Sequence, residues 1–121
     1  MSGTLRAALG LATLLAFAPG AFAHAFLDHA APAVGSTVRT APAAISIWFT
    51  QELESAFSTI KVLDANGNVV AASDKAVDAS DRTLLRVQVP ALSPGTYRVV
   101  WRVLSVDSHV TEGDFTFAVA P

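Results

Sequence analysis

The sequence predicts an all-β domain, built as a Greek-key β-barrel or a β-sandwich. Seven or so short segments alternate apolar and polar residues with the period of two that is typical of β-strands. Turn residues separate these segments at intervals of roughly 8–12 residues. The chain after the first 23 residues shows no long helical periodicity.

The first 23 residues have the three parts of a secretory signal peptide. Arg6 is their only charged residue, and an apolar run over residues 7–18 follows it. Ala21-Phe22-Ala23 then supplies a small-residue cleavage site of the Ala-x-Ala type. The apolar run is too short for a comfortable membrane span. We therefore expect residues 1–23 to be a cleavable signal peptide and residues 24–121 to form one exported domain.

The position of the cut decides which residue begins the exported chain. Cleavage after Ala23 makes His24 the first residue, so that its α-amine and its imidazole Nδ1 can close a chelate ring on one metal ion. Ala23-His24-Ala25 also has the Ala-x-Ala form, and cleavage after Ala25 would remove His24. Retention of the segment as a membrane anchor is a further alternative.

The strands follow one another along the rest of the chain. We predict them at residues 44–49, 59–64, 69–71, 84–89, 96–104 and 114–119, after a short mixed segment at 25–29. Asn66-Gly67 readily adopts positive φ and predicts a β-hairpin between the second and third of these strands. Pro90 ends a strand, and residues 93–95 form a turn. Tyr97 is either a core aromatic residue or one whose hydroxyl fixes a turn.

Alternation also assigns the face of three strands that packs into the core. The inward-facing residues are Ile45, Ile47 and Phe49 in strand 44–49, Tyr97, Val99, Trp101 and Val103 in strand 96–104, and Phe115, Phe117 and Val119 in strand 114–119. Residues 50–54 predict a loop or a short helical turn, and residues 74–82 are turn-like. Residues 105–113 predict a loop at one end of the domain, and this loop carries Asp107 and His109.

Composition narrows the classes of partner and of site. Without the signal peptide the chain has seven Lys and Arg against ten Asp and Glu, with no block of like charge. Neither nucleic acid nor an anionic membrane surface is therefore predicted as a partner. Cysteine is absent, and Met1 is the only methionine. A metal site in the exported domain must use nitrogen and oxygen ligands, because thiolates and thioethers are excluded.

Histidine and aspartate supply the candidate ligands. His24 offers two nitrogens after cleavage, and Asp107 and His109 project the same way if their segment is extended. Three nitrogens and one carboxylate oxygen suit tetragonal Cu(II), which also leads the divalent affinity order. Taken singly, each histidine has a simpler interpretation. His24 is then the residue that happens to follow the cut, His109 a surface residue, and His29 an exposed polar side chain at a strand start.

Several of these residues fit the pattern of a known family. The matching residues are His24 after Ala-x-Ala, Pro32 with Gly35, residues 47–50, and above all residues 94–109 with Gly113. They resemble the CopC family of periplasmic copper-binding proteins over essentially the whole exported chain. The resemblance implies a Greek-key β-barrel of cupredoxin-like or immunoglobulin-like shape with a Cu(II) site of the histidine-brace type. In that site His24 would supply its amine and Nδ1, His109 an imidazole and Asp107 a carboxylate.

Two departures from the family pattern define the expected type of site. Some family members carry a methionine-rich loop that binds Cu(I). This chain has no methionine there, which predicts the type with only a Cu(II) site. Some members also have a glutamate near the copper. Gln51 and Glu52 occupy that place here, and we assign neither as a ligand.

We therefore expect a monomeric, non-enzymatic periplasmic protein that chelates Cu(II) for copper homeostasis or resistance. It would store the ion or deliver it to an inner-membrane importer of the CopD type. A metal-free immunoglobulin-like interaction module is one alternative, and a histidine-brace copper monooxygenase is another. Such an enzyme needs an open coordination position and a broad substrate face. The chain shows no aromatic platform for a substrate, because Trp48 and Trp101 both lie on strands.

Overall fold

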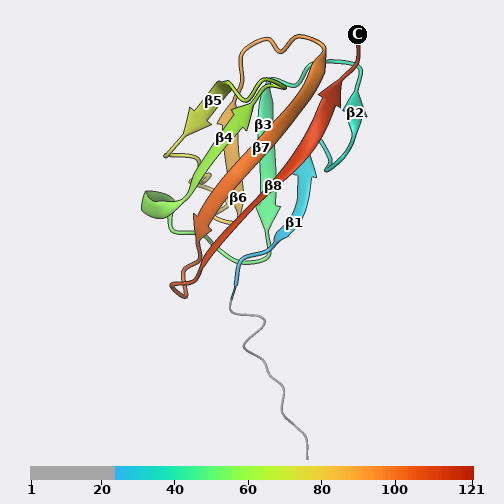
Figure 1. The fold of residues 1–121 in the computed structure, drawn as a ribbon. Coiled ribbons are helices and arrows are strands. Elements are labelled where there is room, and N and C mark those ends of the chain that lie inside the picture. The colour runs from blue at the N-terminus through green and yellow to red at the C-terminus, as the bar shows by residue number, and fades with distance from the viewer. Residues whose placement is uncertain (1–23) are drawn as a thin grey trace, which may run out of the picture.

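The computed structural model describes residues 24–121 of the chain. The predicted signal peptide, residues 1–23, lies outside the described residues. The described part contains eight β-strands and one short 3-10 helix (Figure 1). The strands are β1 (Leu27–Ala31), β2 (Thr37–Val38), β3 (Ala44–Phe49), β4 (Thr59–Leu63), β5 (Val69–Ser73), β6 (Leu84–Gln88), β7 (Gly95–Leu104) and β8 (Val110–Val119), and the helix is η2 (Ser55–Phe57). Among residues 24–121 no helix has the length and hydropathy of a membrane-spanning segment.

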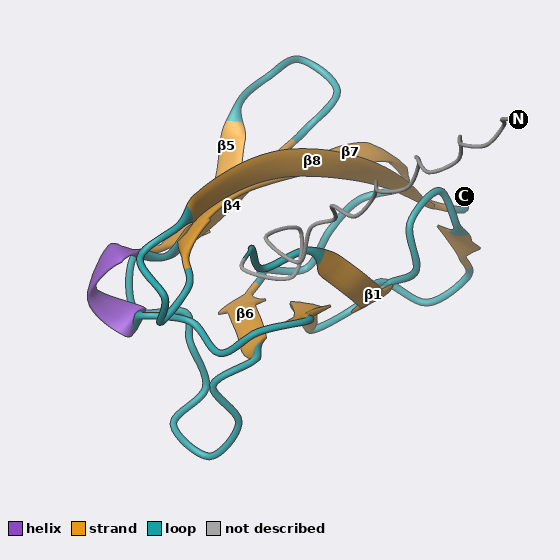
Figure 2. Ribbon diagram, turned by 90° about the horizontal axis from the view of Figure 1, so that it is seen from below, coloured by secondary structure: helices purple, strands orange, loops and turns teal. Residues whose placement is uncertain are grey.

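The strands form two sheets that pack face to face. One sheet has the order β1-β3-β6 and the other the order β2-β8-β7-β4-β5. Figure 2 shows these two layers, with β4, β5, β7 and β8 above β1 and β6. Within the described residues the chain changes sheet at every connection except β4–β5 and β7–β8. β4 and β7 are therefore direct neighbours in one sheet, although β5 and β6 lie between them in the sequence. The predicted all-β class is confirmed, in the form of a two-sheet sandwich.

The core lies between the sheets and is built from the residues that alternation assigned to it. All ten residues predicted to face inward on β3, β7 and β8 are buried. Trp101 meets Phe49 edge to face, with ring centroids 5.0 Å apart. Its indole also lies across β8 at Gly113, where an added Cβ would come 2.3 Å from ring atom Cζ2. Glycine at this position therefore provides the space that the buried indole occupies.

The β4–β5 hairpin forms where Asn66-Gly67 predicted it. Gly67 has a φ of 85°, which is the left-handed conformation that glycine adopts without steric cost. The Asp64 carboxylate accepts hydrogen bonds from the backbone N–H groups of Asn66 and Asn68, both at 2.9 Å. These bonds lower the pKa of Asp64. A side chain at the start of the turn thus fixes its conformation.

β8 begins earlier than predicted. The predicted loop over residues 105–113 is confined to residues 105–109, because residues 110–113 pair with the last four residues of β7. Leu104 lies opposite Val110, and Trp101 lies opposite Gly113. The sequence did not predict this part of the strand because Thr111, Glu112 and Gly113 break the alternation of apolar residues. Its strand conformation is defined by its pairing with β7.

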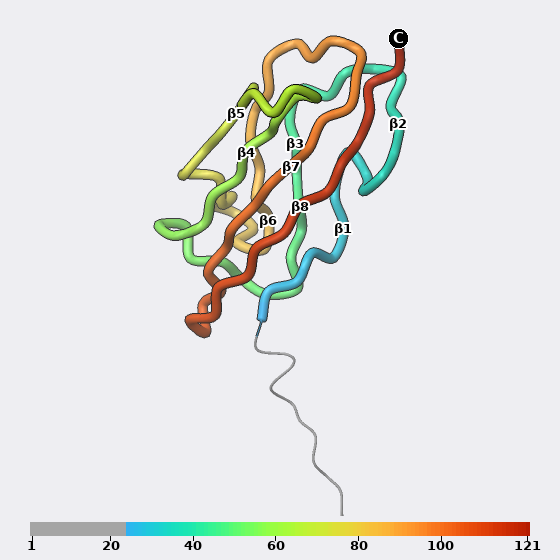
Figure 3. Tube along the Cα trace, in the orientation of Figure 1, coloured from blue at the N-terminus to red at the C-terminus, as the bar shows by residue number. Residues whose placement is uncertain are grey.

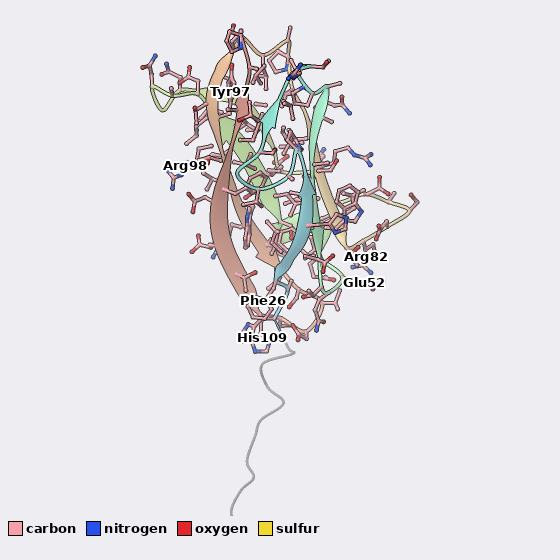
Figure 4. All side chains as sticks on the ribbon, turned by 90° about the vertical axis from the view of Figure 1, so that its right-hand side faces the viewer. Phe26, Glu52, Arg82, Tyr97, Arg98 and His109 are labelled. Atoms are coloured by element: carbon pink, nitrogen blue, oxygen red, sulfur yellow. The ribbon has the colours of Figure 1, made fainter. Side chains whose placement is uncertain are left out.

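Tyr97 combines the two roles proposed for it. Its ring is buried and lies against Phe117, with centroids 5.6 Å apart. Its hydroxyl donates a hydrogen bond to the carbonyl oxygen of Ser93 at 2.6 Å, which fixes the turn before β7. In Figure 4, Tyr97 lies at one end of the sandwich, and Phe26 and His109 lie at the other.

Candidate metal centre

The loop between β7 and β8 carries two of the three predicted ligands. The backbone N–H of Ser105 donates to the carbonyl oxygen of His109 at 3.0 Å, and the N–H of Ser108 donates to the carbonyl oxygen of Ser105 at 2.9 Å. Ser108 has a φ of 74°, so the chain reverses there through the left-handed conformation. Asp107 and His109 therefore approach each other on a tight turn, and not from the extended segment that would have made both side chains project the same way.

Asp107 and His109 are in direct contact. Oδ1 of Asp107 lies 3.2 Å from Nδ1 of His109, within hydrogen-bonding distance. Oδ1 also accepts a hydrogen bond from the hydroxyl of Ser105. The Ser105 hydrogen bond, followed by the hydrogen bond and positive potential of His109, lowers the pKa of Asp107 below its ordinary value. Asp107 is therefore an anion at neutral pH.

His24 lies beside this loop, although it is at the other end of the described chain. Its imidazole centroid is 4.5 Å from that of His109, and the two ring planes meet at 64°. Figure 3 shows the start of the described chain and the β7–β8 loop at the same end of the molecule. Bonds from imidazole nitrogen to a metal ion of this class are about 2 Å long, so the two rings are close enough for both to reach one ion.

Hydrogen bonds fix the segment that presents His24. Ala25 is fully buried, and its carbonyl oxygen accepts a hydrogen bond from the Thr111 hydroxyl of β8 at 2.8 Å. The N–H of Phe26 donates to Oγ1 of Thr50 at 3.0 Å, and the N–H of Thr50 donates to the carbonyl oxygen of Phe26 at 2.9 Å. Immediately after His24 the chain is thus hydrogen-bonded to β8 of one sheet and to the residue that follows β3 of the other.

The side chains alone do not complete a metal site. Within residues 24–121, no three His, Asp or Glu side chains form a cluster able to hold a metal ion. In the predicted site the third nitrogen is the main-chain nitrogen of His24. That nitrogen is a peptide amide in the full chain, and it becomes an amine only if cleavage occurs after Ala23.

Residues 51–54 pack against the β7–β8 loop. The N–H of Val106 donates to the carbonyl oxygen of Glu52 at 3.0 Å, and Leu53 forms an isolated β-bridge with Ser105. The Glu52 carboxylate lies 4.0 Å from Nη1 of Arg82, and Figure 4 shows these two side chains together. Gln51 is half-buried in the same segment.

His29, the remaining histidine, lies on β1 outside this cluster. Its Nδ1 is 2.7 Å from Oδ2 of Asp28. Its ring stacks on Trp48 of β3, with centroids 4.4 Å apart and planes 6° from parallel. The side chain is exposed, as predicted, but the stacking was not predicted.

Ser105 is the residue that sequence reasoning missed. It is fully buried, and its hydroxyl contacts both the Asp107 carboxylate and the main chain of His109. Its sequence signal is its position. Tyr97, Val99, Trp101 and Val103 set a period of two on β7, and Ser105 continues this inward series by one step beyond the strand.

Comparisons with known proteins agree with this fold. The family model described as "CopC domain" matches residues 27–120. The chain is 38% identical over 117 residues to Protein YobA of Escherichia coli K12, covering 96% of this chain and 94% of that protein. It is 30% identical over 111 residues to the Copper transport protein CutJ of Bacillus subtilis, covering 90% of this chain but 20% of that longer protein.

Two solved structures are also similar. The crystal structure of CopC from Methylosinus trichosporium OB3b is 35% identical with a TM-score of 0.72, covering 81% of this chain and 95% of that one. The structure of PcoC, a methionine-rich copper resistance protein from Escherichia coli, is 31% identical with a TM-score of 0.70, covering 79% and 98% of the two chains. The protein is therefore a member of the CopC domain family.

Proposed function

We propose that the exported protein binds one Cu(II) ion at the end of the sandwich formed by His24 and the β7–β8 loop. The observation that carries the proposal is the 4.5 Å separation of the His24 and His109 rings. His24 contributes its amine and Nδ1, His109 contributes one imidazole nitrogen, and Asp107 contributes a carboxylate. This set of nitrogen and oxygen ligands suits tetragonal Cu(II).

The absence of sulfur supports a site for Cu(II) alone. The sequence has no cysteine, and Met1, the single methionine, belongs to the proposed signal peptide. Soft sulfur ligands select Cu(I), whereas imidazole and carboxylate ligands suit Cu(II). The methionine-rich PcoC named above differs in this respect. We infer that this chain belongs to the Cu(II)-only type of the family.

The proposed site depends on cleavage after Ala23 and export to the periplasm. The packing of Ala25 supports this cleavage position over the alternative after Ala25. Ala25 is fully buried and its carbonyl oxygen is hydrogen-bonded to Thr111, so it belongs to the folded domain. A cut after Ala25 would remove a residue of the core together with His24.

We propose that the protein stores copper or delivers it to a CopD-type copper importer in the inner membrane, as a binding protein and not an enzyme. Exposed apolar side chains around the site support a docking role. Phe26 lies near the His24 ring, with centroids 6.0 Å apart, and the exposed residues Val106 and Val110 flank Asp107 and His109 in the chain. The CutJ relative further supports this role, because a domain similar to this chain forms part of a longer copper transport protein.

The binding proposal is tested by titrating Cu(II) into protein whose first residue has been confirmed as His24 by mass spectrometry. One equivalent should give a tetragonal EPR signal with nitrogen couplings. Adding one glycine before His24 should abolish that signal, because the chelating amine is lost. Affinity should fall as the pH is lowered, since protons compete for the amine and the imidazoles. Weak binding without defined stoichiometry, with His24 at the terminus, would refute the proposal.

A further inference from the structure

Ser105 occupies the base of the loop that carries the proposed ligands. Its side chain is fully buried. Its Oγ lies within hydrogen-bonding distance of three groups: Oδ1 of Asp107, the backbone N–H of His109 at 3.3 Å and the carbonyl oxygen of His109 at 3.2 Å. One hydroxyl therefore contacts both residues of the Asp107–His109 pair.

The Ser105 hydroxyl cannot donate to both acceptors within its reach. A serine hydroxyl has one hydrogen to donate and two lone pairs that accept. The carboxylate of Asp107 is the strongest acceptor within reach, because hydrogen bonds to an ionised group are stronger than those to a neutral carbonyl. Ser105 therefore donates to Asp107 and accepts from the N–H of His109. In this arrangement the hydroxyl fixes the carboxylate and closes the loop at the same time.

The fixed carboxylate in turn determines the state of the His109 ring. An ionised carboxylate can only accept hydrogen bonds, so Nδ1 of His109 must carry the hydrogen in the contact of 3.2 Å with Asp107 Oδ1. In the neutral ring Nε2 is then left with a free lone pair. A metal ion binds to such a lone pair, and a carboxylate partner on the other nitrogen commonly orients histidine ligands.

We propose that Ser105 is a positioning residue for copper binding, which acts through Asp107 to hold His109 with Nδ1 protonated and Nε2 free for the ion. The copper part of this inference rests on the proposed function. The tautomer part does not, because it describes the copper-free protein. This arrangement belongs to the copper-free protein: the Asp107 carboxylate lies on the Nδ1 side of the His109 ring, and it would have to leave Nδ1 to become a ligand of an ion bound at Nε2.

The chain provides a matched control in Ser58. This serine is also fully buried, and it lies beside the same end of β7. Its hydroxyl donates to the carbonyl oxygen of Glu54 at 2.8 Å and accepts from the N–H of Leu104 at 3.2 Å. Replacing either serine by alanine thus removes one buried hydroxyl next to the β7 terminus, but only Ser105 contacts the Asp107–His109 pair.

The first measurement is the tautomer of His109 in copper-free protein, read from imidazole nitrogen shifts in NMR at mildly alkaline pH. The wild-type protein and Ser58→Ala should show His109 protonated at Nδ1, whereas Ser105→Ala should show a substantial fraction protonated at Nε2. A wild-type His109 protonated mainly at Nε2 would overturn the inference without any variant. An unchanged tautomer in Ser105→Ala would overturn it as well.

The second measurement is the affinity for Cu(II), determined by competition with a chelator. We expect Ser105→Ala to lower the affinity by about 10–100-fold and Ser58→Ala to leave it within about twofold of wild type. Equal losses in the two variants would reduce Ser105 to a structural residue and contradict the inference. If the wild-type protein binds no Cu(II), the proposed function fails, and the NMR result alone then decides the role of Ser105.

Discussion

Two histidines of this protein each contact an aspartate through Nδ1, yet only one of the two pairs lies at the proposed metal site. The Nδ1 atom of His29 lies 2.7 Å from Asp28, and that of His109 lies 3.2 Å from Asp107. The pairs thus have the same chemistry and similar geometry. Their difference lies in what holds each aspartate and in what lies next to each ring.

The first pair is an isolated surface feature. Asp28 and His29 are consecutive, at a β-bulge in β1, and a bulge turns neighbouring side chains toward one side. Both side chains are largely exposed, at 61% and 59%. Trp48 covers one face of the His29 ring.

The Asp107–His109 pair is held by a buried residue and lies next to a second histidine. The buried hydroxyl of Ser105 holds Asp107, and the ring of His24 stands 4.5 Å from that of His109. The Asp107 side chain is also less exposed than that of Asp28, at 34%. The Asp107–His109 pair therefore differs from the Asp28–His29 pair in two respects: a buried hydroxyl orients its carboxylate, and the ring of a second histidine lies next to it.

The largest expected effect on Cu(II) affinity comes from replacing His109 by alanine, with His29 as the control position. We expect His109→Ala to lower Cu(II) affinity by more than about 100-fold, because it removes a ligand and not merely the support of one. The matched variant His29→Ala should bind with wild-type affinity. Competition titrations with a chelator measure both. Equal affinities of the two variants would show that the pairs do not differ as we argue.

The next effect concerns the two aspartates. Asp107→Asn keeps an oxygen that can accept from Nδ1 of His109 but removes the negative charge that partly neutralises the ion. We expect a loss of Cu(II) affinity of about 10-fold or more. Asp28→Asn is the control, and its titration should overlay that of the wild-type protein. A loss of similar size in Asp28→Asn would contradict the assignment.

A change in the scaffold should separate stability from binding. The Cβ of Gly113→Ala would overlap the indole of Trp101, which is packed against Phe49 in the core. We expect the free energy of unfolding to fall by about 1–3 kcal/mol, as is usual for overpacking. Urea unfolding measures this loss, and Cu(II) affinity of the folded variant should remain unchanged. Unaltered stability would contradict the packing described for Trp101.

The smallest effect is expected at the surface pair. His29→Ala removes the ring that stacks on Trp48, which should lower the free energy of unfolding by about 0.5–1.5 kcal/mol. The same urea experiment measures this loss. A stability loss larger than that of Gly113→Ala would mean that the His29–Trp48 contact contributes more to the fold than its exposure suggests.

Much of the fold was predictable because it follows from local patterns. Alternating residues assigned the core of β3, β7 and β8, and Asn66-Gly67 located a hairpin. β2 has two residues, too few to show a period, and its parallel pairing with β8 depends on tertiary contacts. The first four residues of β8 were missed for a related reason, since they are identified as strand by their pairing with β7.

The candidate site was only partly predictable. His24, Asp107 and His109 were visible because their side chains have ligand chemistry and because a signal-peptide pattern precedes His24. The role of Ser105 could not be predicted, because it depends on the contact of its buried side chain with Asp107, and that contact has no local sequence pattern. The stacking of His29 on Trp48 likewise joins residues of two strands that no local pattern connects.

The most direct test of the central claim is a crystal structure of the protein beginning at His24, grown with one equivalent of Cu(II) and measured at the copper absorption edge. We predict a single anomalous peak bonded to the amine and ring of His24 and to Nε2 of His109, with Asp107 beside it. A peak at the Asp28–His29 pair, or none next to His24 and His109, would contradict the account.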